Sequence, residues 1–522
     1  MRQRSISRSK RAVALLFSVG LVVAACGSDD DAEPADTEAE AEPEADEESS
    51  DEGATDEEES DDGAMDEEES DDGAMDEEES DDGAMDEEES DDGGEASGEA
   101  NAIWGGPPAE PVAAEGDPIK IGVQNLEGDP AGSFPEYSVA VQAAADYINA
   151  ELNGLGGREI EIELCPSIVT PDDSQRCANE LAAEGVDMVL STINFFGNHI
   201  GIYQGAGIPV VVGTPITIAD FTSPGVFSIG AGGGCFGVHT GLVDFATDGI
   251  EEFEGIEVQR VGVPWADTPP GVVCYNDLEA KPLDVINGSE PGDSDRAGSK
   301  PDLEHIGVPI APATPDVTPQ ATEVLDFEPD SIIFSAQGAD CWNFVDALGR
   351  LGWTPDETPL VLSGACTDFD ALAAAGDLAV GIYLTGTANG LFTPADTLPD
   401  GEHKTYVTTY AEKAPEYGMD ASLLFTGFGS QGWSSMMAIW QFAQGIDGEV
   451  TGQGIADALA ASDGSTPTYG AAPLDCAGAS APYVSVCSRD ISIQQWNGEF
   501  LETVIDSLDG SGLVAGTELR PG

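Results

Sequence analysis

The chain is poor in basic residues. Its 522 residues include 17 Lys and Arg against 101 Asp and Glu, which gives a formal net charge of −84. A protein that binds nucleic acid offers a basic surface to the phosphates, whereas the field of this chain would repel them. Nucleic acid is therefore excluded as a partner.

Residues that carry out chemistry are also scarce. The chain has only four histidines, which are scattered without clear partners, and none of its nine cysteines belongs to a Cys-x-x-Cys unit. A zinc site is therefore not expected. No nucleophile elbow, phosphate loop or H-E-x-x-H motif is present, so the sequence does not predict an enzyme. We expect neither a metal nor a cofactor.

The apolar run near the N-terminus is too short for a permanent membrane helix. It covers residues 12–25 and follows a basic stretch at residues 2–11, whereas a spanning helix needs about 20 apolar residues. Residues 1–25 are therefore predicted to be a secretory signal. The signal ends in Val-Ala-Ala-Cys, which resembles the bacterial lipobox. This resemblance implies that Cys26 carries a diacylglycerol and anchors an extracytoplasmic protein to the bacterial cell membrane; the alternative is an ordinary signal with a chance cysteine.

Residues 26–100 lack the apolar side chains that a core requires. They contain 40 of the 101 acidic residues and no Lys or Arg, and the unit DEEESDDGAM repeats from residue 56 onward. Such a segment buries too little apolar area to offset its chain entropy, so we predict a disordered acidic tether. Weak Ca²⁺ binding is a minor alternative, because the repeats lack the spacing of a loop that encloses Ca²⁺.

The remaining cysteines predict disulfide bonds. Once Cys26 is set aside, eight cysteines remain, and an even number in an exported chain favours four disulfides. The sequence does not fix which cysteines pair. Their order suggests neighbouring pairs: Cys165 with Cys177, Cys235 with Cys274, Cys341 with Cys366, and Cys476 with Cys487.

Strand and helix patterns alternate along the folded region. In the first series, β-rich runs alternate with helical spacing; the predicted strands are 118–124, 158–164, 186–191 and 208–212, and the predicted helices are 137–152, 173–184 and 198–205. A second series runs from 238 to 362, beyond the glycine-rich stretch 231–235, which has the composition of a hinge. This alternation predicts an α/β fold with parallel sheets covered on both faces. The length beyond the tether indicates two lobes.

Several segments of the two series resemble one known family. They are NGLGGREIEIEL at 153–164, AGIPVVVG at 206–213, FEPDSIIFSAQGAD at 327–340 and ALGRLGW at 347–353. Their order over residues 117–505 resembles the type I periplasmic binding proteins of the leucine/isoleucine/valine-binding group. The resemblance implies two Rossmann-like lobes joined by a three-crossing hinge. It assigns 117–230 with 381–462 to lobe one and 231–380 with 463–505 to lobe two, with the ligand at the carboxyl ends of the strands.

Candidate ligand contacts in lobe one lie at two strand ends. The turn after the strand at 186–191 precedes a helix, whose N–H groups and dipole favour a carboxylate or polar oxygen. The resemblance implies that this turn and the next strand end hold the ligand's acid group. The alternatives are that Asn194 only caps a helix and that Tyr137 only packs locally. The lobe-one candidates are Tyr137, Asn194, Phe195, Gly197, Gly213, Thr214 and Thr217.

Candidate contacts in lobe two are acidic. Asp267, Asp340 or Asp368 would supply the acid that pairs with an ammonium, and Gln337 lies in the same loop as Asp340. Each aspartate is, as an alternative, a helix N-cap. Where similar amino-acid binders carry an aromatic residue, this chain has Pro270, so amides, urea and aromatic acids stay open beside amino acids.

Together these features predict a monomeric solute-binding lipoprotein of an ABC importer. It would capture a small polar metabolite, such as a branched-chain or related amino acid, an amide or a carboxylate, and deliver this small-molecule ligand to the ABC permease subunits. The alternative is a receptor module that senses the same kind of ligand without transport.

Overall fold

The computed structural model describes the folded part of the chain. The described residues are 108, 110–129, 132–292, 294–387, 390–465, 468–470, 473–479 and 481–513. The predicted signal, the lipid attachment at Cys26 and the acidic tether lie outside them. Among the described helices, none combines the length and the apolar character that a bilayer span requires.

The first lobe is built on a five-stranded parallel sheet with the order β2-β1-β3-β4-β5. The strands are β1 (Gly116–Leu126), β2 (Arg158–Ser167), β3 (Met188–Ser191), β4 (Val210–Val212) and β5 (Val226–Ser228). Every residue of the last three strands is buried, as expected for a sheet covered on both faces.

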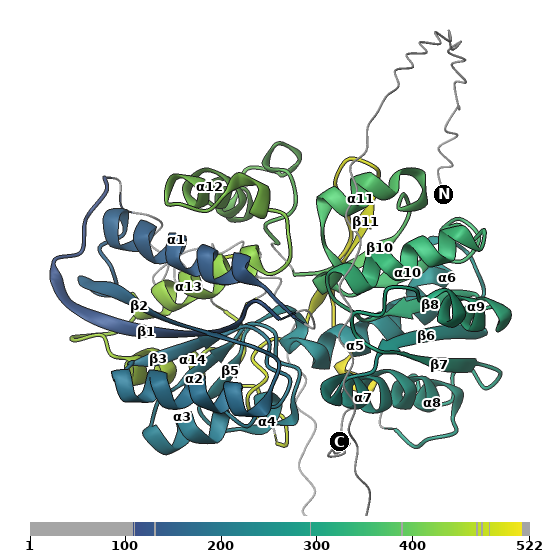
Figure 1. The fold of residues 1–522 in the computed structure, drawn as a ribbon, viewed down its shortest axis with the longest axis horizontal. Coiled ribbons are helices and arrows are strands. Elements are labelled where there is room, and N and C mark those ends of the chain that lie inside the picture. Colours follow the sequence, from purple (N-terminus) through teal and green to yellow (C-terminus); the bar gives the residue numbers. More distant parts are fainter. Residues whose placement is uncertain are drawn as a thin grey trace, which may run out of the picture. The chain divides into compact units, whose positions relative to one another are not determined.

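The described residues of the first lobe form seven α-helices. Figure 1 shows α1 and α13 on one face and α2 and α3 on the other. The helices are α1 (Pro135–Glu151), α2 (Pro171–Glu184), α3 (Ile200–Ala206), α4 (Ile218–Thr222), α12 (Glu402–Glu416), α13 (Gly429–Ala443) and α14 (Gly452–Ala460).

Local sequence explains where these helices begin and end. In α2, the side chain of Thr170 accepts a hydrogen bond from the Asp173 N–H at 3.2 Å, and Pro171 occupies the first turn. Gly185 ends the helix in the left-handed region, with φ of 70°. A polar N-cap, an early proline and a terminal glycine are each favoured at these positions.

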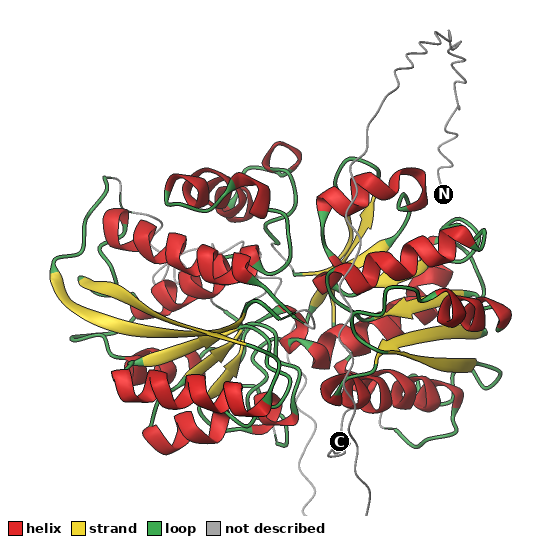
Figure 2. Ribbon diagram, viewed as in Figure 1, coloured by secondary structure: helices red, strands yellow, loops and turns green. Residues whose placement is uncertain are grey.

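The second lobe is built on a seven-stranded sheet with the order β12-β11-β10-β9-β8-β6-β7. Strands β6 to β10 are parallel, and β11 and β12 add an antiparallel ribbon at one edge (Figure 2). The strands are β6 (Arg260–Ala266), β7 (Glu304–Ile310), β8 (Ser331–Phe334), β9 (Leu360–Leu362), β10 (Tyr383–Gly386), β11 (Ile491–Trp496) and β12 (Leu501–Leu508).

Helices cover both faces of this second sheet and bury one apolar cluster on each. Two pairs of helices are continuous through a π-helical turn, α5 with α6 through Phe245–Gly249 and α7 with α8 through Asn276–Ala280. The helices are α5 (Cys235–Asp244), α6 (Ile250–Phe253), α7 (Pro269–Tyr275), α8 (Lys281–Asn287), α9 (Thr318–Asp326), α10 (Ala339–Arg350) and α11 (Phe369–Ala375). The predicted two-lobed α/β fold is thus confirmed.

In the part of the chain that the structure describes, the chain passes between the lobes at residues 229–234, between β10 and Leu391 of the first-lobe core, and at residues 488–490. In the first crossing, Gly232, Gly233 and Gly234 have φ of 57°, 65° and 67°, a region that glycine enters without steric cost. The Gly232 N–H donates to the carbonyl of Asp490 at 3.0 Å, so the first and third crossings lie side by side. The predicted hinge at 231–235 coincides with the first crossing.

Two predicted lobe boundaries need correction. We expected 381–462 in lobe one, yet β10 at Tyr383–Gly386 pairs with β9 and β11 in the second sheet. We expected lobe two to resume at 463, yet Tyr469, Leu474 and Cys487 belong to the core of the first lobe. The second and third crossings lack a glycine-rich stretch like that at 231–235. For this reason the two boundaries predicted from the sequence, at 381 and 463, lie too early in the chain.

All four predicted disulfides are present in the structure. The Cα atoms lie 5.6 Å apart in Cys165–Cys177, 6.2 Å in Cys235–Cys274, 5.7 Å in Cys341–Cys366 and 4.0 Å in Cys476–Cys487. Each bond joins cysteines that neighbour one another in sequence order, so both the number and the pairing are confirmed. Cross-links of this kind restrict the unfolded chain, and they persist in an oxidising compartment.

Candidate functional site

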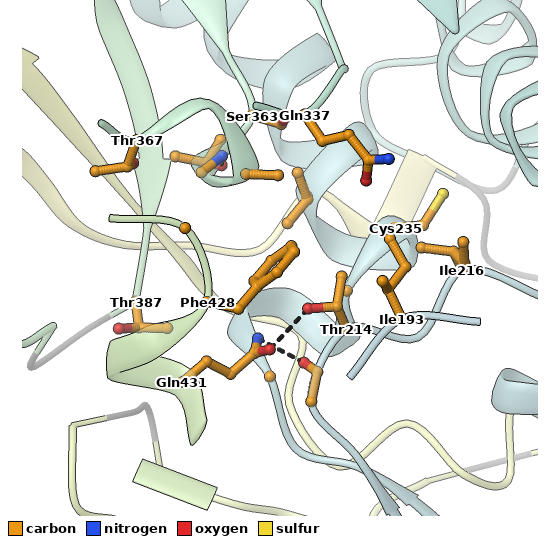
Figure 3. A pocket seen from close by; sticks show the side chains of 18 of the residues that line it. Ile193, Thr214, Ile216, Cys235, Gln337, Ser363, Thr367, Thr387, Phe428 and Gln431 are labelled. Carbon is orange, nitrogen blue, oxygen red and sulfur yellow. Dashed lines mark hydrogen bonds between the residues drawn. The ribbon is translucent and has the colours of Figure 1, made fainter. Parts of the chain in front are cut away.

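A cavity of about 230 Å³ lies where the carboxyl ends of both sheets meet. The first lobe contributes the ends of β3, β4 and β5 and the start of α13. The second lobe contributes α5 and the loops that follow β6, β8, β9 and β10. Figure 3 shows residues of the two lobes facing each other across this space, with Phe428 and Thr214 opposite Gln337 and Ser363. Both lobes therefore enclose one site.

The polar end of the first-lobe wall is held together by Gln431. Its Nε2 donates to the carbonyl of Gly213 at 2.8 Å, and its Oε1 accepts from the Thr214 hydroxyl at 2.8 Å (Figure 3). Gln431 lies on α13, whereas Gly213 and Thr214 follow β4. This pairing fixes the start of α13 against the strand end, and both lie at the cavity surface.

The aromatic part of the same wall is positioned by a buried carboxyl group. Glu136, at the start of α1, is 6% exposed, and its Oε1 accepts from the Phe428 N–H at 3.1 Å. The Phe134 ring packs edge-on against Phe428, with ring centroids 4.8 Å apart. Burial raises the pKa of Glu136 above its ordinary range. The carboxyl group thus sets the position of an aromatic ring that lines the cavity.

The second-lobe wall is rich in hydroxyl and amide groups. Ser335, Gln337, Ser363, Thr367 and Thr385 all line the cavity from the ends of β8, β9 and β10. The Ser363 hydroxyl donates to the carbonyl of Ala336 at 2.9 Å, and the Thr385 hydroxyl accepts from the Gly364 N–H at 2.7 Å. These bonds link neighbouring strand ends, so the polar wall is held rigidly.

Five of the predicted contacts line the cavity. Phe195, Gly213 and Thr214 lie in the first lobe, and Gln337 and Asp340 in the second. Asp340 is half-buried; its carboxylate accepts from the Ala313 N–H at 3.2 and 3.3 Å. Burial raises the pKa of Asp340 above its ordinary range. The roles of these residues in binding stay predictions.

Two predicted first-lobe contacts point away from the cavity. Tyr137 is fully buried in the core behind α13, so local packing explains it. The Asn194 side chain donates to the Ser174 hydroxyl at 2.7 Å and accepts from the N–H groups of Phe196 and Gly197 at 3.0 and 3.3 Å. It therefore holds the turn, while α3 begins only at Ile200.

Two further first-lobe predictions also lie behind the cavity surface. Gly197 has φ of 66° and approaches Thr217 closely, so that a Cβ would meet the Thr217 Oγ1 at 2.6 Å. Thr217 is the N-cap of α4 and forms a reciprocal capping box with Asp220. These residues shape the turn that carries Phe195 and Ile216, which do reach the cavity.

Two predicted second-lobe acids also fall outside the cavity. Asp368 is the N-cap of α11, and its carboxylate accepts from the Ala371 N–H at 2.9 Å. Asp267 is exposed, and its N–H donates to the carbonyl of Ile310 at 2.8 Å. Asp368 is therefore a helix N-cap, which was the alternative interpretation from the sequence.

Sequence reasoning missed the contribution of α13 and of α5. Phe428, Gln431, Ser434 and Ser435 line the cavity from α13 and its preceding residue, and His239 lines it from α5. The cluster of serine, glutamine and glycine in GSQGWSS at 429–435 interrupts an otherwise apolar helix. That interruption was the available signal for a polar face.

The buried carboxyl group of Asp220, beside the cavity, should make the free energy of unfolding depend on pH. Its carboxyl group is 1% exposed, and burial raises its pKa from 3.8 to about 6. The folded state then holds this proton while the unfolded state releases it, so stability falls as pH rises from 3.8 to 6, by about 3 kcal/mol. We expect Asp220→Asn to remove this decline in urea unfolding measured across that pH range.

A matched control for Asp220 is Asp420→Asn. Asp420 is exposed, and the Ser422 N–H and hydroxyl hold its pKa below the ordinary range. Its contribution changes only at lower pH, so this variant should keep the decline. A decline that persists unchanged in Asp220→Asn would show that Asp220 is not its source.

The comparisons with known proteins concern this same two-lobed region. A family model described as periplasmic binding protein matches residues 118–248 and 295–476. No curated protein is a significant match.

Three solved structures illustrate the likeness in fold. A branched-chain amino acid ABC transporter protein from Thermus thermophilus with bound valine has a TM-score of 0.58 at 13% identity, covering 77% of this chain and 98% of its own. LivJ from Streptococcus pneumoniae in complex with isoleucine has a TM-score of 0.53 at 13% identity, covering 74% and 100%. A solute-binding protein of an ABC transporter from Rhodopseudomonas palustris, in complex with 3,4-dihydroxybenzoic acid, has a TM-score of 0.54 at 17% identity. The match covers 76% of this chain and 98% of that protein.

Proposed function

Because the chain belongs to the periplasmic binding protein family, we propose that it is the solute-binding subunit of an ABC importer. It captures a small polar metabolite in the cavity and presents the closed form to the permease subunits. The observation that carries this proposal is a single cavity enclosed by the strand ends of both lobes. A site shared by two lobes couples occupancy to their closure, because the ligand favours the form in which both lobes contact it.

The size of the cavity indicates the kind of solute that it binds. Its volume of about 230 Å³ suits a small metabolite. Structural neighbours of this fold hold isoleucine, valine and 3,4-dihydroxybenzoic acid, so the screening set includes amino acids, amides and aromatic acids. In this proposal the protein acts as a monomer, and residues of a single chain line the cavity.

A thermal-shift screen of such compounds tests the proposal. A ligand at 100 times its Kd adds about 2.7 kcal/mol to the free energy of unfolding, so a true ligand raises Tm clearly. Gln431→Ala should lose the response, because it removes the contacts to Gly213 and Thr214. Gln142→Ala, on the exposed face of α1, should keep it. If no compound of the set shifts Tm, the proposed class of solute is wrong.

We also propose that Cys26 anchors the protein outside the cell membrane and that residues 26–100 connect the anchor to the lobes. The support is the apolar run that ends in Val-Ala-Ala-Cys, together with four disulfides, which suit an exported chain. A diacylglyceryl group carries two acyl chains, which is enough for stable anchoring.

Substitution of the anchor residue should release the protein. In cells fed an alkyne-tagged fatty acid, we expect labelled wild-type protein in the membrane fraction and no label on Cys26→Ala, because the substitution removes the only thiol at the predicted attachment point. Ser28→Ala is the matched control and should stay labelled. Label on the Cys26→Ala protein would place the lipid elsewhere.

A further inference from the structure

One acid is fully buried immediately behind the second-lobe wall. Glu279, in the π-helical turn between α7 and α8, has 0% of its surface exposed. The Ser335 hydroxyl donates to its Oε1 at 2.9 Å, and His239 Nδ1 lies 2.8 Å from the same oxygen. Oε2 is buried without a hydrogen-bond partner among the described residues. Ser335 and His239 both line the cavity, so one hidden carboxyl group supports two cavity groups.

This arrangement determines what the two groups offer to a ligand. Ser335 gives its single proton to Glu279, which leaves the lone pairs of its hydroxyl for the cavity. The His239 ring is not aligned for a straight hydrogen bond, yet its Nδ1 faces a carboxyl oxygen. That proximity favours the proton on Nδ1 and leaves Nε2 as an acceptor in the neutral ring. Ser335 therefore accepts hydrogen bonds from the cavity, and His239 does so in its neutral form.

The charges around the cavity agree with an acceptor-rich wall. The described residues that line it include no Lys or Arg. Their ionisable side chains are Asp340 and His239. An anionic ligand would find no cationic side chain to offset its loss of hydration. A group with N–H donors would find the Ser335 oxygen, the His239 ring and the Asp340 carboxylate.

The helix N-termini at the cavity do not reverse this preference. An anion would seek such an end, because N–H groups and the helix dipole favour negative charge there. At α13, however, the Phe428 N–H already donates to Glu136, and at α5 the Cys235 N–H donates to the carbonyl of Pro215 at 2.9 Å. The first turn of α10 carries Asp340. Protein groups thus occupy part of the anion-binding capacity at these three helix ends.

The rest of the cavity is largely apolar. Ile193, Ile216, Ile229 and Phe428 line it from the first lobe, and Val238 lines it from the second. We propose, resting on the proposed function, that the cavity binds an apolar small molecule bearing a non-anionic N–H donor group, an ammonium, amidinium or primary amide, at the Ser335–His239 wall, with Glu279 as the residue that positions this wall. A carboxylate on the ligand is not required.

Matched probes separate the donor group from the acid. Isothermal titration compares 3-methylbutylamine with 4-methylpentanoate, and benzylamine, benzamidine and benzamide with benzoate. We expect at least one N–H donor of a series to bind and its carboxylate partner to bind at least about tenfold more weakly, the ratio expected for one hydrogen bond to a charged group. Binding of the carboxylates but not of the donors would overturn the inference while leaving solute capture intact.

Glu279→Gln tests the positioning role. Glutamine keeps the volume but brings N–H donors, so it should weaken the binding of the donor probe about tenfold or more. The ¹⁵N shifts of His239 should also change, because Nδ1 no longer faces a carboxylate; a merely structural role would leave them unmoved. Glu290→Gln, exposed after α8, is the control.

A second variant covers the case in which Glu279→Gln fails to fold. Ser335→Ala removes one acceptor and leaves the buried acid in place. It should weaken the binding of the donor probe without strengthening the binding of the carboxylate probe. Wild-type affinity for the donor in Ser335→Ala, or failure of every donor probe to bind, would refute the assigned ligand class. In the latter case, the thermal-shift screen decides separately whether the protein captures another kind of solute.

Discussion

Replacing Gly230 with alanine should lower the free energy of unfolding by about 3 kcal/mol and abolish ligand binding. Gly230 follows β5 and Gly213 follows β4, and both line the cavity. An added Cβ at Gly230 would lie closer than 3.0 Å to the Gly213 carbonyl oxygen and 3.2 Å from Gln431 Nε2. The backbone would have to shift, and the shift would break the hydrogen bond from Gln431 that holds the wall.

The chain contains a matched control for this substitution. Gly201 lies exposed in α3, and a Cβ there would meet nothing within 4 Å. Gly201→Ala should therefore be neutral or stabilise by about 0.5–1 kcal/mol, because alanine loses less chain entropy in a helix. Urea unfolding and thermal shift with the identified ligand compare the two variants. Wild-type stability and affinity in Gly230→Ala would show that the close approach of the two strand ends is unnecessary.

The sequence predicted those parts of the fold that depend on neighbouring residues. Short apolar runs between amphipathic segments are buried strands of a parallel sheet, because such a sheet is covered on both faces; β3 and β4 follow this rule. The antiparallel ribbon of β11 and β12 was not predicted. It lies beyond the alternating series, and its partner β10 precedes it by more than a hundred residues.

The candidate site was predicted less completely, because it depends on contacts between residues that are far apart in the sequence. Thr214 was recognised from its strand end, but its partner Gln431 lies 217 residues later, and no local pattern joins them. Glu279 and Ser335 are 56 residues apart on different elements. By contrast, the possible N-cap role of Asp368 follows from a few adjacent residues, and the structure shows that role.

An aromatic cluster bridges the two lobes beside the cavity. Phe369, the first residue of α11 in the second lobe, stacks on Phe425 of the first lobe with ring centroids 5.2 Å apart at 17°. Phe392, which lines the cavity, lies 6.0 Å from the ring of Phe369 and 6.2 Å from that of Phe425. The Gly427 N–H donates across the lobes to the carbonyl of Thr367 at 3.3 Å. These contacts exist only while the lobes are together.

Phe369→Ala should therefore shorten the lifetime of the bound state. Loss of the stacked pair and its buried area removes on the order of 1–2 kcal/mol from the closed form, which corresponds to a dissociation rate about tenfold higher. The association rate should change little, because in the proposed mechanism capture begins on open lobes, in which this contact would be absent. Stopped-flow measurement with the ligand found by thermal shift gives both rates.

Phe253→Ala separates this effect from a general loss of stability. Phe253 ends α6, is 44% exposed and packs on Phe245 rather than at the cavity. Both variants lose one partly exposed aromatic ring, but only Phe369 joins the lobes. If Phe253→Ala raised the dissociation rate as much as Phe369→Ala, the cluster would not be the contact that retains the ligand. If Phe369→Ala alone does so, the closed form owes its lifetime to side chains that join the lobes as well as to the ligand between them.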